Sequence, residues 1–510
     1  MRMLKKSLLM ISGLLAGAAE SRSGGPLLCF FIMIPLFYAA DTADKNESPR
    51  RALVMSCMPF LVGYDFAKTA FMLQLYRSLD YSIPVGVLFS VIAAVGTSLI
   101  LLTAQTVCLY FYNGIKKEGA AGVAVFSLLF AGSEWLCEHL GPLSFAWLGV
   151  WAQADGAEWL LMSSKLFGCR FTSFIIMMIN GLLYLTIVRL KRRNFISSGK
   201  ALLASAAIVS GCAVYGLQET VALKTQADRS EGISVAAMQL DCEGSEKSEI
   251  GSRASAGQYL SMIKSLEKRQ HTELIFLPET AVNTTYKSGA EQFSGIEKFC
   301  SESGCTVLTG CFYRERDGKH NSVIALTPNG ISKEVYSKAH LVPFGEYVPF
   351  SWATGEDSLA ASVSERKPID IGGVEIGCGI CIESTYSDIF REQARRGAEL
   401  FYIPTNDSWF GNSAAREAHY MHAKIRAIEN SRYTVRAGNC GISAVITPWG
   451  EELSVLSTKE RGAVTAEIKP LSSKSVYTVV GDSFILLPLV LICVSASKSA
   501  AAKYRLRNQA

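Results

Sequence analysis

Hydrophobic residues are distributed unevenly along this chain. Long, mostly uncharged runs fill positions 1–222, a mixture of polar and apolar residues fills 223–473, and a further apolar run covers 476–497. A helix that spans a bilayer needs about 20 predominantly apolar residues. The pattern therefore predicts a helical membrane domain over 1–222, an inserted soluble domain over 223–473, and a last membrane helix with its tail over 474–510.

Six of the apolar runs are long enough to span a membrane. They cover residues 52–76, 84–112, 120–140, 159–188, 201–222 and 476–497. Two shorter runs, 7–19 and 26–40, come before them. The basic start of the chain before 7–19 also fits a secretory signal. No A-x-A-like site precedes the run 26–40, which favours a short helical hairpin and about eight membrane helices in all.

Composition and charge agree with a membrane protein. Of 510 residues, 49% are hydrophobic and 19% charged, and the mean hydropathy is +0.23. With eight spans, the basic loops 41–51, 113–119 and 189–200 fall on the same side as both tails. The positive-inside rule makes that side cytoplasmic and places 223–473 outside the cytoplasm. The net charge of +5 follows from this asymmetry, and no basic and aromatic stripe indicates a nucleic-acid partner.

The segment 223–473 alternates short apolar runs with polar, helix-like stretches, which is typical of a layered α/β domain. The predicted strands are 234–240, 273–279, 306–314, 321–328, 374–383, 400–407 and 441–450. The predicted helices are 254–269, 291–303, 386–396 and 413–434. Between them, residues 351–370 are polar without periodicity and are predicted to form a loop.

Two cysteines lie close together in the stretch GCGICIES, residues 377–384. Cys378 and Cys381 fit a redox pair, half of a zinc site, two core residues, or a nucleophile beside a bystander. On a regular strand, residues an odd number apart point to opposite faces, which argues against a shared disulfide. Zinc needs two more ligands, and the nearest pair, His419 and His422, lies on a predicted helix where packing is the simpler interpretation. No metal is therefore expected.

Seven cysteines fall in the outer segment. They are Cys242, Cys300, Cys305, Cys311, Cys378, Cys381 and Cys440. An oxidising compartment permits disulfides among them, but the sequence leaves their pairing open, and buried thiols are the alternative.

Three predicted strand ends each place a reactive side chain near a turn. Glu279 lies in LIFLPET, Lys338 in VYSKAHLVPFGEYVP, and Cys381 in GCGICIES. Catalytic groups are often found on loops that a rigid sheet holds in place. Taken singly, a solvated carboxylate, a surface lysine and a core thiol are the simpler interpretations. Together, the three supply a base, a cation and a nucleophile.

The order Glu279, Lys338, Cys381 with these flanks resembles the nitrilase superfamily of carbon-nitrogen hydrolases over roughly residues 230–470. More narrowly, KAHLVPFGEYVP, CIES and TNDSWFGNSAAREAHYMHAKIRAIENSRYTVRAGNCGISAVITPWG resemble the apolipoprotein N-acyltransferases. The resemblance implies a nitrilase-like αββα sandwich outside an eight-helix membrane domain, which agrees with the predicted topology. The membrane half matches only loosely, chiefly around GPLSFAWLGVWAQ.

The resemblance also implies a role for each reactive residue. Cys381 is the nucleophile, and Glu279 is the general base that takes its proton. Lys338 stabilises the oxyanion of the tetrahedral intermediate together with the backbone N–H of Ile382. This position after the nucleophile is often aromatic in the family, so the isoleucine changes any side-chain contact with an acyl chain while the backbone donor remains.

Four further residues match supporting positions. Glu346 and Glu383 correspond to acids that orient the lysine and keep it charged. Trp409 and Phe410, in DSWFG, supply apolar cover at the mouth of the site, with ordinary core packing as the alternative.

The implied activity is a two-step acyl transfer without a cofactor. The cysteine takes an acyl chain from a phospholipid as a thioester and passes it to the α-amine of a diacylglyceryl-cysteine at the N-terminus of an apolipoprotein. The implied location is the bacterial inner membrane, with the catalytic domain on the periplasmic side. Three alternatives stay open: a membrane-tethered amidase that uses water as acceptor, a transporter, and a non-catalytic lipoprotein-binding scaffold.

Overall fold

The structure is a computed structural model with two compact units. One unit comprises residues 1–73, 87–218 and 480–510, and the other comprises 74–86 and 219–479. The residues that the structure describes are 2–20, 25–43, 48–77, 83–115, 119–141, 144–241, 244–342, 346, 359–362, 366–410, 414–494 and 497.

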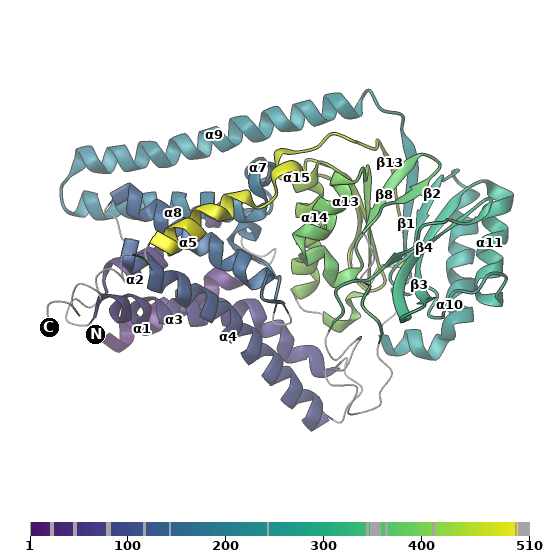
Figure 1. Ribbon diagram of the computed structural model, residues 1–510, viewed down its shortest axis with the longest axis horizontal. Coiled ribbons are helices and arrows are strands. Elements are labelled where there is room, and N and C mark those ends of the chain that lie inside the picture. The colour runs from purple at the N-terminus through teal and green to yellow at the C-terminus, as the bar shows by residue number, and fades with distance from the viewer. Residues whose placement is uncertain are drawn as a thin grey trace. The chain divides into compact units, whose positions relative to one another are not determined.

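The first unit is helical. The helical elements that lie wholly or partly in it are α1 (Arg2–Ala18), η1 (Leu28–Phe30), α2 (Ile34–Asp41), α3 (Pro49–Thr69), η2 (Ala70–Arg77), α4 (Ile83–Ile115), α5 (Gly119–Glu138), η4 (Val150–Ala154), α6 (Glu158–Leu161), α7 (Ser164–Phe167), α8 (Cys169–Lys191), α9 (Phe195–Ala227) and η7 (Ser483–Ile485). Helix α15 (Val476–Val480) belongs to the second unit except for its last residue. Figure 1 shows α4 and α9 as the long helices among them. Within the described residues, α4, α5, α8 and α9 are long and apolar enough to cross a membrane, so the chain is a membrane protein.

Two of the predicted spans are interrupted. The run 159–188 is not one helix, because Gly168 separates α7 from α8 with a φ of +81°. The run 476–497 breaks at Gly481, whose φ is +62°. Glycine adopts this left-handed conformation without the steric cost that other residues incur, so each glycine ends a helix that hydrophobicity alone would extend.

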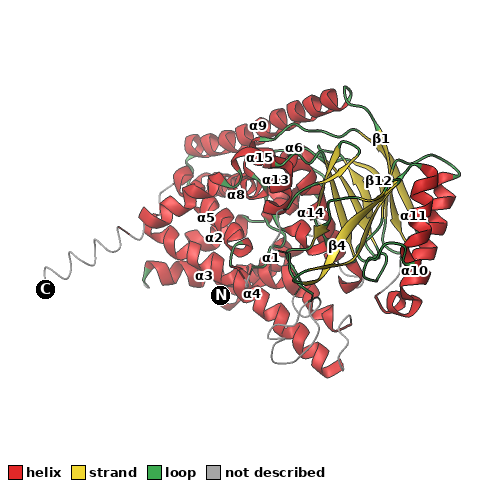
Figure 2. Ribbon diagram, turned by 45° about the vertical axis from the view of Figure 1, so that its right-hand side comes forward, coloured by secondary structure: helices red, strands yellow, loops and turns green. Residues whose placement is uncertain are grey.

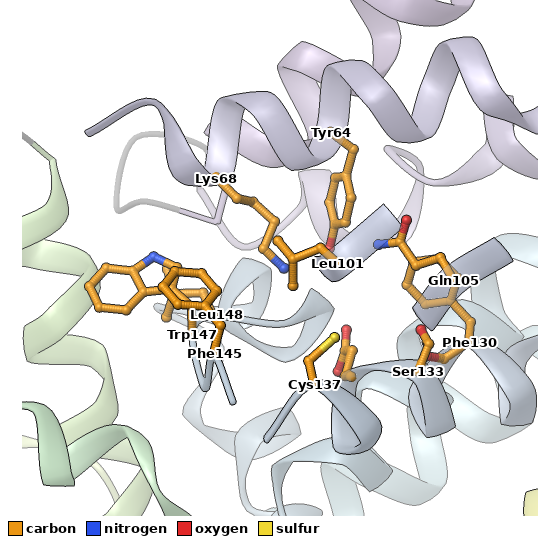
Figure 3. Close-up of a pocket in the computed structure, with 11 residues that line it drawn as sticks. Tyr64, Lys68, Leu101, Gln105, Phe130, Ser133, Cys137, Phe145, Trp147 and Leu148 are labelled. Carbon is orange, nitrogen blue, oxygen red and sulfur yellow. The ribbon is translucent and has the colours of Figure 1, made fainter. Parts of the chain in front are cut away.

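Charged side chains inside this unit have partners there. The ammonium of Lys68 lies 3.3 Å from the Glu20 carboxylate, and the Arg170 guanidinium lies 2.8 Å from Glu138. Figure 3 shows Lys68 at a pocket with Tyr64, Gln105 and the aromatic residues Phe145 and Trp147 among its walls. Ionisable residues in membrane segments usually face the protein interior and pair with one another, which accounts for the charges that interrupt the apolar runs.

Two β-sheets build the second unit. The first has the order β13-β1-β2-β3-β4-β5, with β6 also paired to β4, and the second has the order β12-β11-β10-β9-β8-β7. The strands are β1 (Ile233–Gln239), β2 (Leu274–Phe276), β3 (Thr306–Glu315), β4 (Gly318–Thr327), β5 (Gly330–Ile331), β6 (Tyr336–Ser337), β7 (Ile369–Ile371), β8 (Val374–Cys378), β9 (Leu400–Thr405), β10 (Tyr433–Gly438), β11 (Ser443–Ile446), β12 (Glu452–Leu456) and β13 (Gly462–Ile468).

Helices cover the outer face of each sheet (Figure 2). Helices α10 (Gly244–Glu267) and α11 (Glu291–Ser303) pack on the first sheet, and α13 (Ser387–Arg395) and α14 (Ala415–Asn430) pack on the second. The sheets face each other in the middle, where the rings of Phe276 and Tyr402 lie 4.9 Å apart and the Tyr402 hydroxyl donates to the Leu277 carbonyl. This αββα sandwich confirms the expected fold class.

Several predicted boundaries in this unit were wrong. The run 374–383 is strand only to Cys378, and the predicted helix 413–434 ends at Asn430, after which β10 begins. Ser431 takes a φ of +57° and stops that helix, although no glycine marks the position. The strands β5, β6, β7, β10, β12 and β13 had not been predicted. Of the predicted loop 351–370, residues 351–358 and 363–365 lie outside the described part of the chain.

Candidate active site

Three buried side chains extend from the ends of strands in both sheets. Glu279 lies three residues beyond β2, Lys338 directly follows β6, and Cys381 lies three residues beyond β8. Their exposed fractions are 6%, 1% and 7% respectively. A carboxylate and an ammonium that are this well buried need partners, because removing charge from water is costly.

The partners of Lys338 are two carboxylates. Its Nζ donates to Oε1 of Glu279 at 3.1 Å and to Oε1 of Glu346 at 2.8 Å. The side-chain amide of Asn321 donates to the same two oxygens, at 2.8 Å each. The second oxygen of Glu346 accepts from the backbone N–H of Val342 at 2.8 Å. The lysine and the asparagine therefore bridge the two acids and fix their separation.

These contacts set the charge of the lysine. Burial alone would lower the pKa of Lys338, but the Glu279 and Glu346 carboxylates outweigh that effect and hold the pKa well above its usual range. An ammonium has three N–H donors, and the two carboxylates accept two of them. Within the described part of the chain these are the hydrogen-bond acceptors of Nζ, which leaves one N–H for a further acceptor.

Glu383 reaches the same region through the backbone. Its carboxylate accepts from the N–H groups of Ala339 and His340 at 2.7 and 3.1 Å, from that of Ile380 at 2.8 Å, and from the Tyr336 hydroxyl at 2.9 Å. Burial raises the pKa of Glu383, while the backbone donors and the charge of Lys338 oppose that rise. This acid thus ties the segment after Lys338 to the turn that precedes Cys381.

Cys381 adopts a strained backbone conformation. Its φ is +54°, and it opens the 3-10 turn η5 (Cys381–Thr385) instead of continuing β8. Residues other than glycine rarely take such an angle, and they keep it only where the surroundings enforce it, commonly at functional sites. The argument that Cys378 and Cys381 alternate along one strand therefore loses its premise. Cys378 itself is a fully buried residue of β8.

The thiol of Cys381 is held in its protonated form at rest. Burial raises its pKa, and the Glu279 carboxylate raises it further, while the charge of Lys338 acts in the opposite direction. A thiol becomes strongly nucleophilic when it loses its proton. A nucleophilic role for this thiol would therefore require a base, and Glu279 is the carboxylate with the largest effect on the thiol.

Close backbone packing places Glu279. A Cβ built at Gly310 of β3 would lie 2.5 Å from the Thr280 nitrogen, 2.7 Å from the Pro278 oxygen and 2.8 Å from the Glu279 Cα. All three are backbone atoms, so they cannot rotate away. Glycine at this position allows β3 to approach the segment that carries the acid.

A second polar network lies on the other side of the nucleophile. His419 of α14 has Nδ1 2.8 Å from Oδ1 of Asp407 and Nε2 3.0 Å from the carbonyl oxygen of Cys381. Arg436 of β10 donates to Oδ2 of Asp407 at 2.6 Å. Burial opposes ionisation of Asp407, but Arg436 and His419 hold its pKa below its usual range.

The ligand atoms of Cys381, Asp407 and His419 lie within 4.8 Å of one another, which raises the question of a metal. The Asp407 carboxylate is already neutralised by the Arg436 guanidinium, and a cation bound there would lie beside that positive charge. His419 also directs Nε2 toward a backbone carbonyl. The donor set thus fits a hydrogen-bonded network better than a cation site.

Of the residues expected to line the mouth, Phe410 packs edge-on against the His419 ring, with centroids 5.5 Å apart. The side chain of Trp409 lies outside the described part of the structure, as does Cys242. Ile382, after the nucleophile, is half-buried. The remaining six cysteines predicted for this domain are all buried.

Sequence reasoning missed Asn321, Tyr336, Asp407 and Arg436, and it considered His419 as a metal ligand or, preferably, as a packed helix residue. Asn321 is the first residue of the predicted strand 321–328, and Asp407 belongs to the motif TNDSWFG. The sequence therefore offered a reason to consider each of them as a candidate site residue. A buried amide at the start of an apolar strand is unusual enough to be a candidate.

Comparisons with known proteins identify the family of the chain. The sequence profile of the carbon-nitrogen hydrolase family matches residues 212–476. Among curated relatives, an apolipoprotein N-acyltransferase of Methylococcus capsulatus is 30% identical, over 72% of this chain and 73% of its own length. One of Gloeobacter violaceus is 30% identical over 46% of this chain and 47% of its own, and one of Borreliella burgdorferi is 22% identical over 93% and 91%.

Among solved structures, a nitrilase-superfamily member of branch 10 from Saccharomyces cerevisiae has a TM-score of 0.39 at 18% identity, covering 49% of this chain and 93% of that one. The family profile covers more than half of the chain, and the Methylococcus relative is matched over nearly three quarters of its length. The chain therefore belongs to the apolipoprotein N-acyltransferase family, with a catalytic domain of the carbon-nitrogen hydrolase type.

Proposed function

We propose that this protein acylates the N-terminal diacylglyceryl-cysteine of apolipoproteins with a chain taken from a phospholipid, through a thioester on Cys381. Family membership supports the acyl transfer. The observation that carries the mechanism is the buried arrangement of Glu279, Lys338 and Glu346 beside the strained Cys381.

In the first step, Sγ of Cys381 attacks the carbonyl carbon of the phospholipid ester, and Glu279 takes the thiol proton. The oxyanion that forms accepts from the third N–H of Lys338 and from the backbone N–H of Ile382. When the intermediate collapses, the ester C–O bond breaks, and Glu279 returns the proton to the departing lysophospholipid oxygen. The products are a lysophospholipid and an acyl thioester.

In the second step, the α-amine of the lipoprotein attacks the thioester carbonyl. Glu279 accepts a proton from the amine, and the same donors stabilise the second oxyanion. The C–S bond then breaks, Cys381 regains its proton, and the product is an amide. Because both steps pass through a tetrahedral oxyanion, one set of donors serves both.

A location in the membrane suits both proposed substrates, because one is a phospholipid and the other is a lipid-modified protein. The four long apolar helices anchor the chain in a bilayer, where the phospholipid and the lipid-modified acceptor reside. We propose the bacterial inner membrane, with residues 223–473 on the periplasmic side, on the basis of the basic loops 41–51, 113–119 and 189–200. Trp409 and Phe410 are proposed to contact the acyl chain.

Mass spectrometry of the purified protein after incubation with phospholipid tests this function. We expect an acyl adduct on Cys381, followed by transfer to a synthetic diacylglyceryl lipopeptide. Cys381→Ser should form no adduct, since an oxygen nucleophile ionises far less readily than a thiol. Cys378→Ser is the matched control and should keep most of the activity, because Cys378 is buried in β8.

Two results would contradict the proposal. Release of free fatty acid without transfer to the lipopeptide would favour the membrane-tethered amidase. Equal loss of activity in both cysteine variants would favour a role that the two thiols share.

A further inference from the structure

His419 is a fully buried histidine directly behind the nucleophile. Its Nε2 lies 3.0 Å from the Cys381 carbonyl oxygen and 3.0 Å from the Ser384 hydroxyl. On the opposite edge of the ring, Nδ1 lies 2.8 Å from Asp407 and 3.2 Å from Arg436. The ring therefore joins α14 to the backbone of the reactive cysteine.

The contact between Nε2 and the Cys381 carbonyl is a hydrogen bond when Nε2 carries the hydrogen, because a carbonyl oxygen can only accept. The Arg436 guanidinium, which can only donate, lies 3.2 Å from Nδ1 and favours the tautomer with the hydrogen on Nε2. Asp407 and Arg436 fix the ring from its Nδ1 edge, and both have side chains that are fully buried. Thr405 also donates to Asp407, at 2.8 Å, so the carboxylate cannot swing away from the ring.

The carbonyl of Cys381 and the N–H of Ile382 are two ends of one peptide group. The described part of the chain contains no cis peptide bond, and in a trans peptide the carbonyl and the N–H point in opposite directions. A hydrogen bond that holds the carbonyl toward α14 therefore turns the Ile382 N–H to the other side. The positive φ of Cys381 needs such a restraint, because it is unfavourable in isolation.

We propose that His419 is a positioning residue for the oxyanion donor: its Nε2–H holds the peptide between Cys381 and Ile382 so that the Ile382 N–H faces the reacting carbonyl. The proposal rests on the acyl transfer proposed above. It assigns His419 to the stabilisation of the oxyanion and leaves thiol activation to Glu279. The charges that act most strongly on the Cys381 thiol are those of Glu279 and Lys338.

Three substitutions of His419 separate the donor from the bulk of the ring. His419→Gln places an amide N–H near the position of Nε2, whereas His419→Asn keeps a polar contact toward Asp407 but is too short to reach the Cys381 carbonyl. His419→Leu fills a similar volume without a donor. We expect the Asn and Leu variants to slow both acyl-enzyme formation and acyl transfer by about tenfold or more, and the Gln variant to stay within about threefold of wild type.

Alkylation of Cys381 by iodoacetamide supplies the second readout. This reaction displaces iodide at a saturated carbon and forms no oxyanion, so it reports on thiol access and ionisation alone. The alkylation rate at Cys381, followed by peptide mass spectrometry, should stay within about twofold of wild type in all three variants. His422→Gln, a buried histidine on the same helix, is the matched control and should change neither rate.

The outcomes distinguish this inference from the function on which it rests. If wild-type protein forms no acyl adduct with phospholipid vesicles, the proposed function fails. If wild type forms the adduct and the Asn and Leu variants react equally fast, the role of His419 is overturned. It is also overturned if alkylation and acyl transfer fall together in the variants, because that pattern indicates general damage to the site.

Discussion

The positive charge of Lys338 is the feature of the site that a single substitution tests most directly. Lys338→Met removes the charge and the three N–H donors at nearly constant length. Because each half-reaction passes through an oxyanion, we expect both acyl-enzyme formation and acyl transfer to slow by on the order of a hundredfold or more, about 3 kcal/mol in each barrier. Single-turnover kinetics with a preformed acyl-enzyme measure the second step alone.

Glu279→Gln is the comparison for that measurement. It keeps the shape of the acid but removes the base, so it should slow acylation of Cys381. If Lys338→Met instead transferred its acyl group at the wild-type rate, the lysine would act only as a counter-charge for Glu279 and Glu346, which it contacts at 3.1 and 2.8 Å.

At the scale of elements, the approach of β3 to the segment after β2 positions the base. Gly310→Ala introduces a Cβ within 2.8 Å of three backbone atoms of residues 278–280, so that segment must move. We expect a loss of about 1 to 3 kcal/mol in the free energy of unfolding and at least a tenfold loss of acylation rate, since small misplacements of catalytic groups are costly.

Gly257→Ala is a suitable control for that substitution. Gly257 lies in α10, and a Cβ built there meets no atom within 4 Å. Alanine is the better helix former, so this variant should be as stable as wild type or slightly more stable. Wild-type acylation by Gly310→Ala would show that Glu279 does not depend on this contact.

A comparison of the predicted strands with the observed ones shows how much of the fold the sequence pattern could predict. Runs of apolar residues predicted β1, β3, β4 and β9, and the apolar runs before Glu279 and Cys381 correspond to β2 and β8. The end of β8 at Cys378 could not be predicted, since the turn to Cys381 depends on a local contact from Glu383 to the Ile380 N–H and on the distant residue His419. Two-residue strands such as β6 carry no periodicity at all.

The hydrogen-bonded network around Cys381 could not be predicted from the sequence pattern either. Asn321, Asp407 and Arg436 are polar residues within apolar stretches of the sequence. Only the fold shows that Asn321 contacts Glu279 and that Asp407 pairs with Arg436. The family resemblance supplied the proposed roles of Glu279, Lys338 and Cys381, but the residues that contact them became visible only through their distances.

At the scale of the whole molecule, the orientation in the membrane decides whether the site can meet its substrates. The basic segment 189–200 was predicted as a loop, but it comprises the end of α8 at Lys191 and the start of α9 at Phe195, and the strands of the catalytic domain begin after α9. The positive-inside rule places that loop in the cytoplasm, and one crossing by α9 then places the domain outside it. The predicted boundaries at residues 222 and 473 belong to the same hypothesis.

Fusions to a reporter that is active only outside the cytoplasm test this orientation. A reporter joined after residue 230 should be active, whereas one joined near Arg193 should be silent, because a single span of 33 residues, Phe195–Ala227, separates the two points. Replacing the basic residues of the 189–200 loop with glutamine should weaken this difference, since those charges supply the orienting signal. The reverse pattern of activity would place Cys381 on the cytoplasmic side and would contradict the proposed access to exported lipoproteins.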